Sequence, residues 1–343
     1  MKIVHDFIYQ HGGGENLITS ISEIFGSQII TAFNTRKKYN FIKQSCLSSI
    51  LKKNTFLVFL YFFFIFRINT KETILFSGNH CCFSIRRCKA KKKILYAHSL
   101  PKSLFSNLYL DHDTNFLIKF FYSFLSNHYQ KNLFSFDKII FNSRKTKQKF
   151  LHIFPNLEQK VSLDVLYPFS NMPFVEKNLN NLKKQKYFVI NSRHQSYKNI
   201  QLVFVLLKEF LKNNKDINIF VTHSGELSAN LKEDNSLKNI IFTGYLDLEK
   251  YINLLSNSIG IIFPSRDEDF GISALDAYNL DIPVLVQKNC GFSEILPNDY
   301  KFFYNDTNLI DIMNEIKNNY PKKVYFNKVN YKKVFSNYLA DKL

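Results

Sequence analysis

The sequence predicts an α/β protein made of two doubly wound domains, each a parallel sheet covered by helices. Short apolar, β-branched runs alternate with longer helical patterns along the 343 residues, which is typical of parallel sheets with helices on their faces. A polar, proline-containing stretch between Pro168 and Lys186 interrupts this alternation and indicates a linker. Polar residues gather where the expected strands end, and ligands of open α/β sheets bind at those ends.

The apolar runs place five strands in each half of the chain. In the first half they are Lys2–His5, Gln28–Ala32, Thr73–Ser77, Ile94–His98 and Lys138–Asn142. In the second half they are Tyr187–Asn191, Ile217–Thr222, Asn239–Thr243, Ile259–Phe263 and Ile282–Val286. Helical patterns lie between them, such as Asn199–Leu211 and Leu248–Ser256. We expect domains over residues 1–170 and 187–327, a linker over 171–186 and an amphipathic helix in 328–343.

Composition narrows the class of protein. Hydrophobic residues make up 45% of the sequence, which is enough for two cores, and the formal net charge of +18 implies an anionic partner. The basic residues are dispersed, which disfavours nucleic acid as that partner. Five cysteines without a CxxC pair fit a reducing cytosol. The chain opens on a strand-like pattern, so no signal peptide is expected.

One segment raises the question of a membrane. Thr55–Phe66 is almost wholly apolar and is bracketed by Lys52, Lys53 and Arg67. It is too short to cross a bilayer as a helix. Two interpretations remain open: a buried helix, or a segment that dips into a membrane surface.

The most informative motif runs from Pro264 to Ala277. It follows the apolar strand Ile259–Phe263, turns at Gly271 and continues as a helix, with Glu268 before the helix and Asp276 inside it. The free N–H groups at the start of such a helix form an anion site. Carboxylates beside it can hold hydroxyl groups, so the motif fits a nucleotide-sugar. The alternative is a capped helix with two solvated acids.

Other candidate site residues also follow strands. Gly12, Gly13 and Gly14 come after the first strand and would let the backbone approach a ligand closely. Arg193 and Lys198 follow the strand that opens the second half. Arg can bind two phosphate oxygens at once and Lys adds a point charge, so the pair suits a phosphate cluster.

The motifs together resemble those of family-4 retaining glycosyltransferases. The segment from Pro264 is similar to their Glu-x7-Glu signature, with Asp269 where they have Gly and Asp276 where they have the second Glu. The sequence around His98, Tyr-x-His-Ser-x-Pro, resembles a motif of bacterial mannosyltransferases of cell-surface polysaccharide synthesis. The resemblance runs in order from Gly12 to Phe335 and is stronger in the second half.

The resemblance implies a fold and a set of site residues. The fold would be GT-B, in which two Rossmann-like domains face a central cleft, the first for the acceptor and the second for the donor, and the C-terminal helix crosses back to the first domain. The implied catalytic residues are Glu268, His98, Arg193 and Lys198. The implied donor-binding residues are Gly13, Gly14, Arg193, Lys198, Gly244, Tyr245, Phe270, Gly271, Ile272 and Asp276, and Glu294 also lines the cleft. Glu268 would hold the sugar hydroxyls and Asp276 the ribose hydroxyls.

The implied reaction moves a hexose, with mannose favoured, from a donor such as GDP-mannose or a UDP-sugar to a glycan or lipid-linked acceptor. Arg193 and Lys198 would stabilise the leaving diphosphate without a metal or other cofactor. We expect a cytoplasmic enzyme, peripheral on an anionic inner membrane face. Three alternatives remain: a nucleotide-sugar epimerase of the same fold, a basic nucleic-acid-binding protein, and a divalent metal site at Asp267-Glu268-Asp269.

Overall fold

The structure is a computed structural model that describes residues 1–9, 12–35, 41–52, 54–105, 116–174, 186–233, 238–320, 324–325 and 328–342. The chain divides into two compact units. Unit 1 comprises Met1–Pro168 with Lys332–Leu343, and unit 2 comprises Phe169–Tyr331. Most of the expected linker, residues 175–185, lies outside the described residues.

Unit 1 contains a seven-stranded parallel sheet in the order β3-β2-β1-β5-β7-β8-β9. The strands are β1 (Lys2–His5), β2 (Gln28–Thr31), β3 (Ile42–Gln44), β5 (Ile74–Ser77), β7 (Lys93–Ala97), β8 (Lys138–Phe141) and β9 (Ser162–Val165). The central strand β1 pairs with β2 on one side and β5 on the other, with Lys2 opposite both Gln28 and Ile74. Two short strands, β4 (Ile68–Asn69) and β6 (Cys88–Lys89), form a separate sheet.

The helices of unit 1 follow from local sequence signals. They are α1 (Gly13–Phe25), α2 (Ser48–Leu51), α3 (Thr55–Leu60), α4 (Lys102–Phe105), α5 (Phe116–Leu133), α6 (Arg144–Ile153) and α7 (Leu157–Lys160), with a 3-10 helix, η2, over Cys81–Arg87. α1 ends at Gly26, whose φ of 56° is left-handed. Ser143 caps α6 by accepting a 2.9 Å hydrogen bond from the N–H of Thr146.

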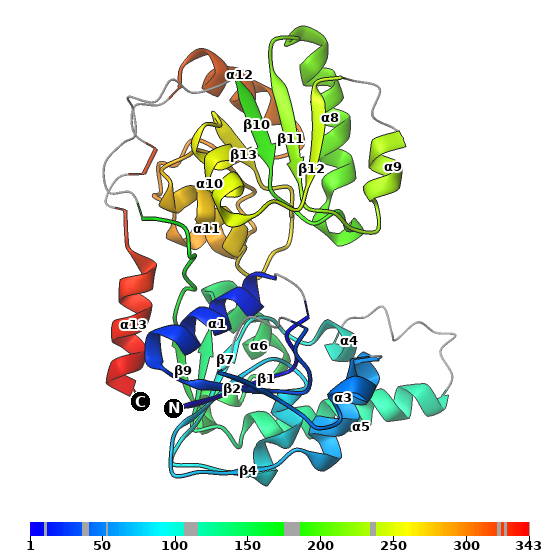
Figure 1. Cartoon of the computed structure of the whole chain (residues 1–343), viewed down its shortest axis with the longest axis vertical. Coiled ribbons are helices and arrows are strands. Elements are labelled where there is room, and N and C mark those ends of the chain that lie inside the picture. Colours follow the sequence, from blue (N-terminus) through cyan, green and yellow to red (C-terminus); the bar gives the residue numbers. More distant parts are fainter. Residues whose placement is uncertain are drawn as a thin grey trace. The chain divides into compact units, whose positions relative to one another are not determined.

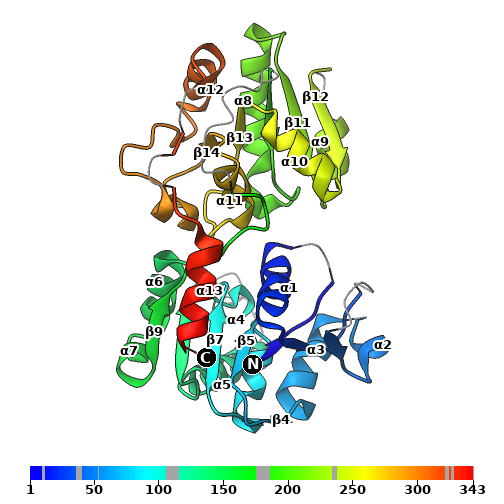
Figure 2. The ribbon, with the colours of Figure 1, turned by 60° about the vertical axis from the view of Figure 1, so that its left-hand side comes forward.

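The C-terminal helix α13 (Tyr331–Lys342) supplies a side chain to the core of unit 1. Phe335 is fully buried, and its ring centroid lies 5.5 Å from that of Tyr96 in β7. The hydroxyl of Tyr338 bonds the carboxylate of Asp164 in β9, and α13 runs beside that strand in both views (Figures 1 and 2). The end of the chain thus packs with residues from its first half.

The apolar segment Thr55–Phe66 forms α3 followed by a π-helix, η1 (Tyr61–Ile65). Four of its side chains, Val58, Phe59, Phe62 and Phe66, are buried in the core of unit 1. Its remaining large apolar side chains include Phe56, Phe64 and Ile65, which are exposed. The segment therefore belongs partly to the core and partly to the surface. Among the described residues, no helix is long and apolar enough to cross a membrane.

Unit 2 is built on a five-stranded parallel sheet in the order β12-β11-β10-β13-β14. The strands are β10 (Tyr187–Ile190), β11 (Asn218–Thr222), β12 (Ile240–Gly244), β13 (Gly260–Ile262) and β14 (Val284–Leu285). The helices are α8 (Ile200–Asn213), α9 (Ser228–Glu233), α10 (Leu248–Ser256), α11 (Ile272–Asn279) and α12 (Leu309–Asn318), with 3-10 helices over Ser196–Lys198 and Gly291–Ile295. The crossovers through α8 and α10 run in opposite directions along the sheet, so right-handed connections place these helices on opposite faces (Figure 1).

All ten expected strands are present, with ends that differ by at most two residues. One shift changes the position of a site residue: β7 covers Lys93–Ala97 rather than Ile94–His98, so His98 is the first residue after the strand. The prediction missed β3 and β9, the two edge strands of the seven-stranded sheet, and also the short strands β4 and β6. The residues of β3 and β9 are exposed or half-exposed and form no apolar run, because an edge strand has no neighbouring strand to cover its outer side.

Candidate functional site

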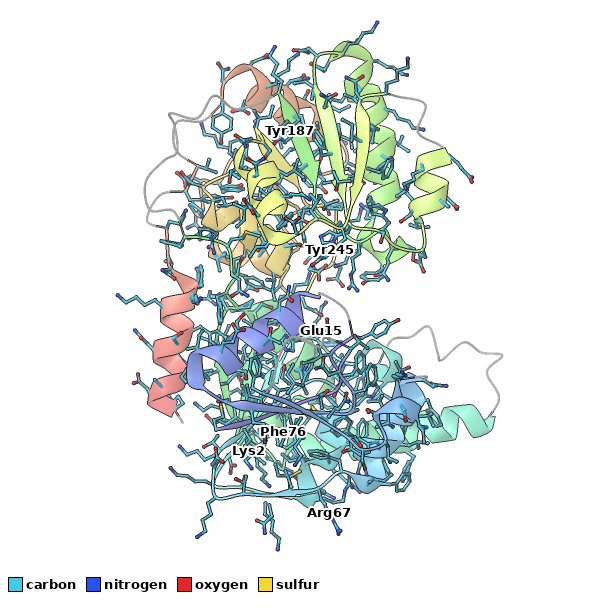
Figure 3. The ribbon with its side chains drawn as sticks, in the orientation of Figure 1. Lys2, Glu15, Arg67, Phe76, Tyr187 and Tyr245 are labelled. Atoms are coloured by element: carbon cyan, nitrogen blue, oxygen red, sulfur yellow. The ribbon has the colours of Figure 1, made fainter. Side chains whose placement is uncertain are left out.

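The candidate site in unit 2 lies at the carboxyl ends of β10 and β13. These neighbouring parallel strands mark the point where the strand order reverses, which is where open α/β sheets bind their ligands. Figure 3 shows Tyr187 at one end of this sheet and Tyr245, which follows β12, at the other. The carboxyl end carries Arg193 and Lys198 after β10 and Glu268 after β13.

Lys198 and Glu268 form an ion pair across 70 residues of sequence. Their side chains are 11% and 24% exposed, so water screens the pair only in part. The structure thus joins the cation that we expected on a phosphate to the carboxylate that we expected on a sugar. An anionic ligand would have to compete with Glu268 for the lysine.

Arg193 is exposed and is held by a tyrosine. Its guanidinium donates a 3.0 Å hydrogen bond to the hydroxyl of Tyr197, and the Nζ atom of Lys198 lies 5.2 Å from the centroid of the same ring. One aromatic side chain therefore supports both expected phosphate ligands. Tyr197 was not among the predicted site residues, although it directly precedes Lys198.

Asp276 is enclosed by hydroxyl groups. Its Oδ2 atom accepts a 2.9 Å hydrogen bond from Tyr251, and its Oδ1 atom accepts one from Ser170. Burial raises the pKa of Asp276 to about 6, and the two hydrogen bonds oppose that rise. Both carboxylate oxygens already have protein donors, so a ribose would be a third partner. Neither Ser170 nor Tyr251 belongs to a recognisable motif, and the sequence analysis missed both.

Asn191 extends this network to the neighbouring strand. Its Nδ2 group donates to the hydroxyl of Tyr251 and to the carbonyl of Ser273, the latter at 3.2 Å. Its Oδ1 atom can only accept, so the 2.9 Å contact with His223 Nε2 requires a proton on that nitrogen. Burial, then His194 and Arg193, lower the pKa of His223 to about 4. His223 is therefore neutral near pH 7.

The turn before α11 depends on two glycines. Gly271 has a φ of 98°, and a Cβ atom there would lie 2.9 Å from the ring of Phe263. A Cβ atom on Gly291 would fall 2.0 Å from the carbonyl oxygen of Asp269, and the Gly291 N–H donates to the carbonyl of Glu268 at 3.0 Å. These close contacts fix the backbone that carries Glu268.

The remaining predicted residues of unit 2 surround this turn or lie beside it. Phe270 is only 2% exposed, so any ligand contact there involves its backbone. Ile272 opens α11, whose first N–H groups lack intrahelical partners, and Glu294 lies in the 3-10 helix that follows Cys290. Gly244 ends β12 with a φ of 67°, and Tyr245 is 61% exposed.

Unit 1 carries the other predicted residues, Gly13, Gly14 and His98. The imidazole Nε2 atom of His98 lies 2.6 Å from the hydroxyl of Ser77, which the sequence analysis missed. Burial and then His5 lower the pKa of His98 to about 3, while Asp6 acts in the opposite direction. A Cβ atom on Gly14 would lie 3.6 Å from the His98 ring, so the structure brings these two residues together.

The start of α1 and the loop after β5 are held by acidic side chains of unit 1. Gly13 is the first residue of α1, and Glu15 accepts a 2.9 Å hydrogen bond from the N–H of Gly12. Asp6 accepts hydrogen bonds of 2.6 to 3.0 Å from three successive backbone N–H groups, those of residues 79–81. A Cβ atom on Gly78 would meet Asp6 at 2.5 Å. Asp6 thus occupies the switch point between β1 and β5.

The metal alternative at Asp267-Glu268-Asp269 gains no support from the described part of the chain. Within it, no group of three His, Cys, Asp or Glu side chains converges as metal ligands would. The middle residue, Glu268, is paired with Lys198.

Sequence comparison supports part of the expected identity. Residues 172–333 match the family described as Glycosyl transferases group 1. The Alpha-1,3/1,6-mannosyltransferase ALG2 of Mus musculus is 26% identical over 179 residues, which cover 45% of this chain and 43% of the mouse protein. The chain thus spans less than half the length of this relative.

Structural comparison covers more of the chain. A mutant of S. aureus TarM, in complex with fondaparinux, alpha-GlcNAc-glycerol and UDP, matches with a TM-score of 0.57 at 14% identity over 84% of this chain and 56% of TarM. WaaG, a glycosyltransferase involved in lipopolysaccharide biosynthesis, matches with a TM-score of 0.62 at 11% identity over 100% of this chain and 96% of WaaG. The chain therefore has the GT-B fold of glycosyltransferases, and its second half carries a match to the Glycosyl transferases group 1 family.

Proposed function

We propose that this chain is a metal-independent, retaining glycosyltransferase of family 4. It would move a hexose, with mannose favoured, from a nucleotide-diphosphate sugar to a glycan or lipid-linked acceptor in surface polysaccharide synthesis. The observation that carries the proposal is the meeting of Lys198 and Glu268 at the strand-order reversal, inside the segment that matches Glycosyl transferases group 1. The similarity to the mannosyltransferase ALG2 favours mannose, and the similarity to WaaG, which is involved in lipopolysaccharide biosynthesis, favours a surface glycan.

The proposed chemistry begins with an exchange of partners. The donor diphosphate takes Lys198 from Glu268, which frees the carboxylate to accept hydrogen bonds from sugar hydroxyls. Arg193, held by Tyr197, and the first N–H groups of α11 add further stabilisation as charge develops on the leaving diphosphate. These groups supply the positive charge that a metal ion would otherwise provide.

Two other residues have proposed roles. His98, neutral because of its low pKa, would hydrogen-bond the donor sugar through a ring nitrogen. Asp276 would reach the ribose while it keeps its bonds to Ser170 and Tyr251. We propose that the enzyme acts in the cytoplasm, peripherally on the inner membrane face, where a lipid-linked acceptor is accessible.

Ligand binding tests the donor class first. Thermal stability of the full chain would be measured with GDP-mannose, UDP-glucose, UDP-N-acetylglucosamine and the free nucleotides. A donor present at 100 times its Kd should add about 2.7 kcal/mol to the free energy of unfolding. If no nucleotide-sugar shifts the melting temperature, the proposal fails.

Turnover in EDTA with the ligand so identified then tests the roles of the ion pair. Lys198→Ala should lower kcat by a factor that corresponds to about 3 kcal/mol, because one donor to the leaving group is lost. Glu268→Gln should lower kcat far more than it weakens the binding of free nucleotide. Lys212→Ala, on the exposed side of α8, is the matched control. A strict requirement for manganese or magnesium would contradict the proposal. Conversion of the donor without any acceptor would indicate an epimerase instead.

A further inference from the structure

Unit 1 exposes an apolar surface where α3, the π-helix and α5 meet. We call it the aromatic surface and define it as Phe56, Phe64, Ile65 and Phe124, which are 50%, 66%, 56% and 50% exposed. Single exposed apolar residues are common on soluble proteins, but a contiguous group of this size marks an interaction site.

The three phenylalanine rings of the aromatic surface are connected through Phe59 and Phe63. The ring of Phe63 lies 4.6 Å from that of Phe64 and 6.4 Å from that of Phe124. Phe59 lies 5.3 Å from Phe63 and 5.9 Å from Phe56, and it is buried in the core of unit 1. The aromatic surface therefore rests on rigid packing.

The π-helix separates core from surface within one turn. The N–H of Phe66 bonds the carbonyl of Tyr61 at 2.8 Å, five residues back, which widens the helix. Phe62 and Phe66 are 0% and 5% exposed, whereas Phe64 between them is the most exposed phenylalanine of the segment. Single π-helical turns of this kind are frequent at functional sites.

Cations border the aromatic surface. The ring of His128 lies 4.8 Å from that of Phe63 and 6.2 Å from that of Phe124. Burial lowers the pKa of His128, and Arg86, Arg87 and Lys131 lower it further, which places three positive charges near these rings. Arg86 and Lys131 are exposed.

Negative charge is nearly absent from this part of the sequence. From Ile24 to Lys131, the range that contains the aromatic surface, there are seventeen Lys and Arg residues and three acidic residues, Glu72, Asp111 and Asp113. Glu72 pairs with the N-terminal ammonium group at 2.8 Å. The lysine and arginine residues of this region therefore far outnumber the carboxylates that could neutralise them.

We propose that the aromatic surface docks on an anionic phospholipid bilayer. Its four side chains would enter the interface between headgroups and acyl chains, while Arg86, Lys131 and neighbouring cations contact lipid phosphates. A protein partner would have to match the outline of the four side chains, whereas lipid adapts to them. This inference deepens the proposed peripheral location and rests on it, but its test needs no glycosyl transfer.

Vesicle flotation of the full chain tests the proposal. Wild type should float with vesicles of phosphatidylcholine plus phosphatidylglycerol and remain unbound with phosphatidylcholine alone. The double variant Phe64→Ser, Ile65→Ser should bind roughly tenfold more weakly, because two apolar side chains no longer leave water. Arg86→Gln with Lys131→Gln should cause a loss of roughly tenfold and a weaker response to salt.

Two variants on unit 2 test whether the loss of any exposed apolar or basic side chain changes vesicle binding. Val205→Ser replaces a side chain that is 62% exposed on α8, and Lys212→Gln with Lys215→Gln removes two exposed cations. Both should bind vesicles like wild type. Circular dichroism melting curves should show that all variants are folded.

Three results would overturn the proposal. They are wild-type flotation by the Phe64→Ser, Ile65→Ser variant, equal binding to neutral and anionic vesicles, and no vesicle binding at all. A dimer in sedimentation velocity that this variant converts to a monomer, without vesicle binding, would assign the aromatic surface to a second copy of the chain. Glycosyl transfer without vesicle binding would leave the proposed reaction intact and reject only the docking surface.

Discussion

At the scale of single residues, the sequence predicts that His98 follows a strand, and the fold sets the position and the charge of its ring. Its ring stands between Tyr96, at a centroid distance of 5.1 Å, and the hydroxyl of Ser77. A pKa of about 3 means that the ring is neutral over the physiological range. This neutral state adds stability that is fully present above pH 6.5 and is lost as the pH falls toward 3, because the unfolded chain binds the proton more readily.

Replacing Ser77 should disturb that arrangement. Ser77→Ala leaves a buried ring nitrogen without its partner, so the free energy of unfolding should fall by about 1–3 kcal/mol. In ¹⁵N NMR the ring signals of His98 should shift, whereas the control Ser258→Ala, which removes a buried hydroxyl in unit 2, should leave them unchanged. Unchanged His98 signals in Ser77→Ala would show that the hydroxyl does not hold the ring.

Asp276 should make stability depend on pH in the opposite direction. Its pKa rises from 3.8 to about 6 on folding, so the folded protein binds the proton more tightly. Its contribution to the free energy of unfolding should therefore fall by roughly 3 kcal/mol as the pH rises from about 4 to about 6, and stay level above that range.

Asp276→Asn should remove this decline. Urea unfolding from pH 4 to pH 7.5 gives the difference in unfolding free energy between wild type and each variant, which cancels the opposite pH dependence that His98 and His223 contribute to all of them. This difference should fall by roughly 3 kcal/mol between pH 4 and pH 6 for Asp276→Asn and stay constant for the control Asp299→Asn, an exposed residue of the same unit. If wild type and Asp276→Asn gave parallel curves, the carboxyl group would not be the source of the pH dependence.

At the scale of elements, the site of unit 2 depends on the contact between the turn before α11 and the 3-10 helix Gly291–Ile295. The N–H groups of Gly291 and Phe292 donate to the carbonyls of Glu268 and Phe270 at 3.0 and 2.8 Å. Cys290, directly before Gly291, is buried, and its thiol donates to the carbonyl of Phe270 at 3.2 Å. These three bonds tie the 3-10 helix to the turn before α11.

Gly291 itself should not tolerate a side chain. Gly291→Ala must push back the backbone at Asp269, so we expect a loss of about 1–3 kcal/mol in unfolding free energy and weaker nucleotide binding. Gly26→Ala is the control, because a Cβ atom there meets no neighbouring atom. Its unfolding free energy should fall by roughly 1 kcal/mol, the cost of an alanine in a left-handed backbone conformation. Chemical denaturation and titration with the nucleotide measure both effects, and equal behaviour of the two variants would contradict the steric argument.

At the scale of the whole molecule, unit 1 depends on residues from both ends of the sequence. Phe335 of α13 is fully buried in unit 1, and Val334 beside it is 45% exposed. Phe335→Ala should cost about 3–5 kcal/mol, whereas Val334→Ala should stay within about 0.5 kcal/mol of wild type.

Hydrogen exchange locates the effect of Phe335→Ala. Amides of β7 and β8 should exchange faster in this variant, while those of β10 and β11 should be unaffected, because unit 2 has its own sheet and core. Uniformly faster exchange in both sheets would show that the two units unfold together.

The sequence by itself predicted ten of the strands and their parallel arrangement, and it located the candidate site residues after those strands. Apolar periodicity and glycine turns are local signals, and each motif follows a strand within a few residues. The edge strands β3 and β9 could not be predicted in this way, because a strand without a neighbour on its outer side needs no apolar run. His98 and Glu268 could be placed at strand ends for the same local reason.

Only the tertiary structure decided which of these residues meet. The Lys198–Glu268 pair and the Ser170–Asp276 bond join positions 70 and 106 residues apart, and no local pattern records such distances. The structure also divided Thr55–Phe66 between core and surface. Its composition is apolar throughout, so which side chains are buried depends on the neighbouring elements that pack against the helix, η2 and α5, which the segment itself does not specify.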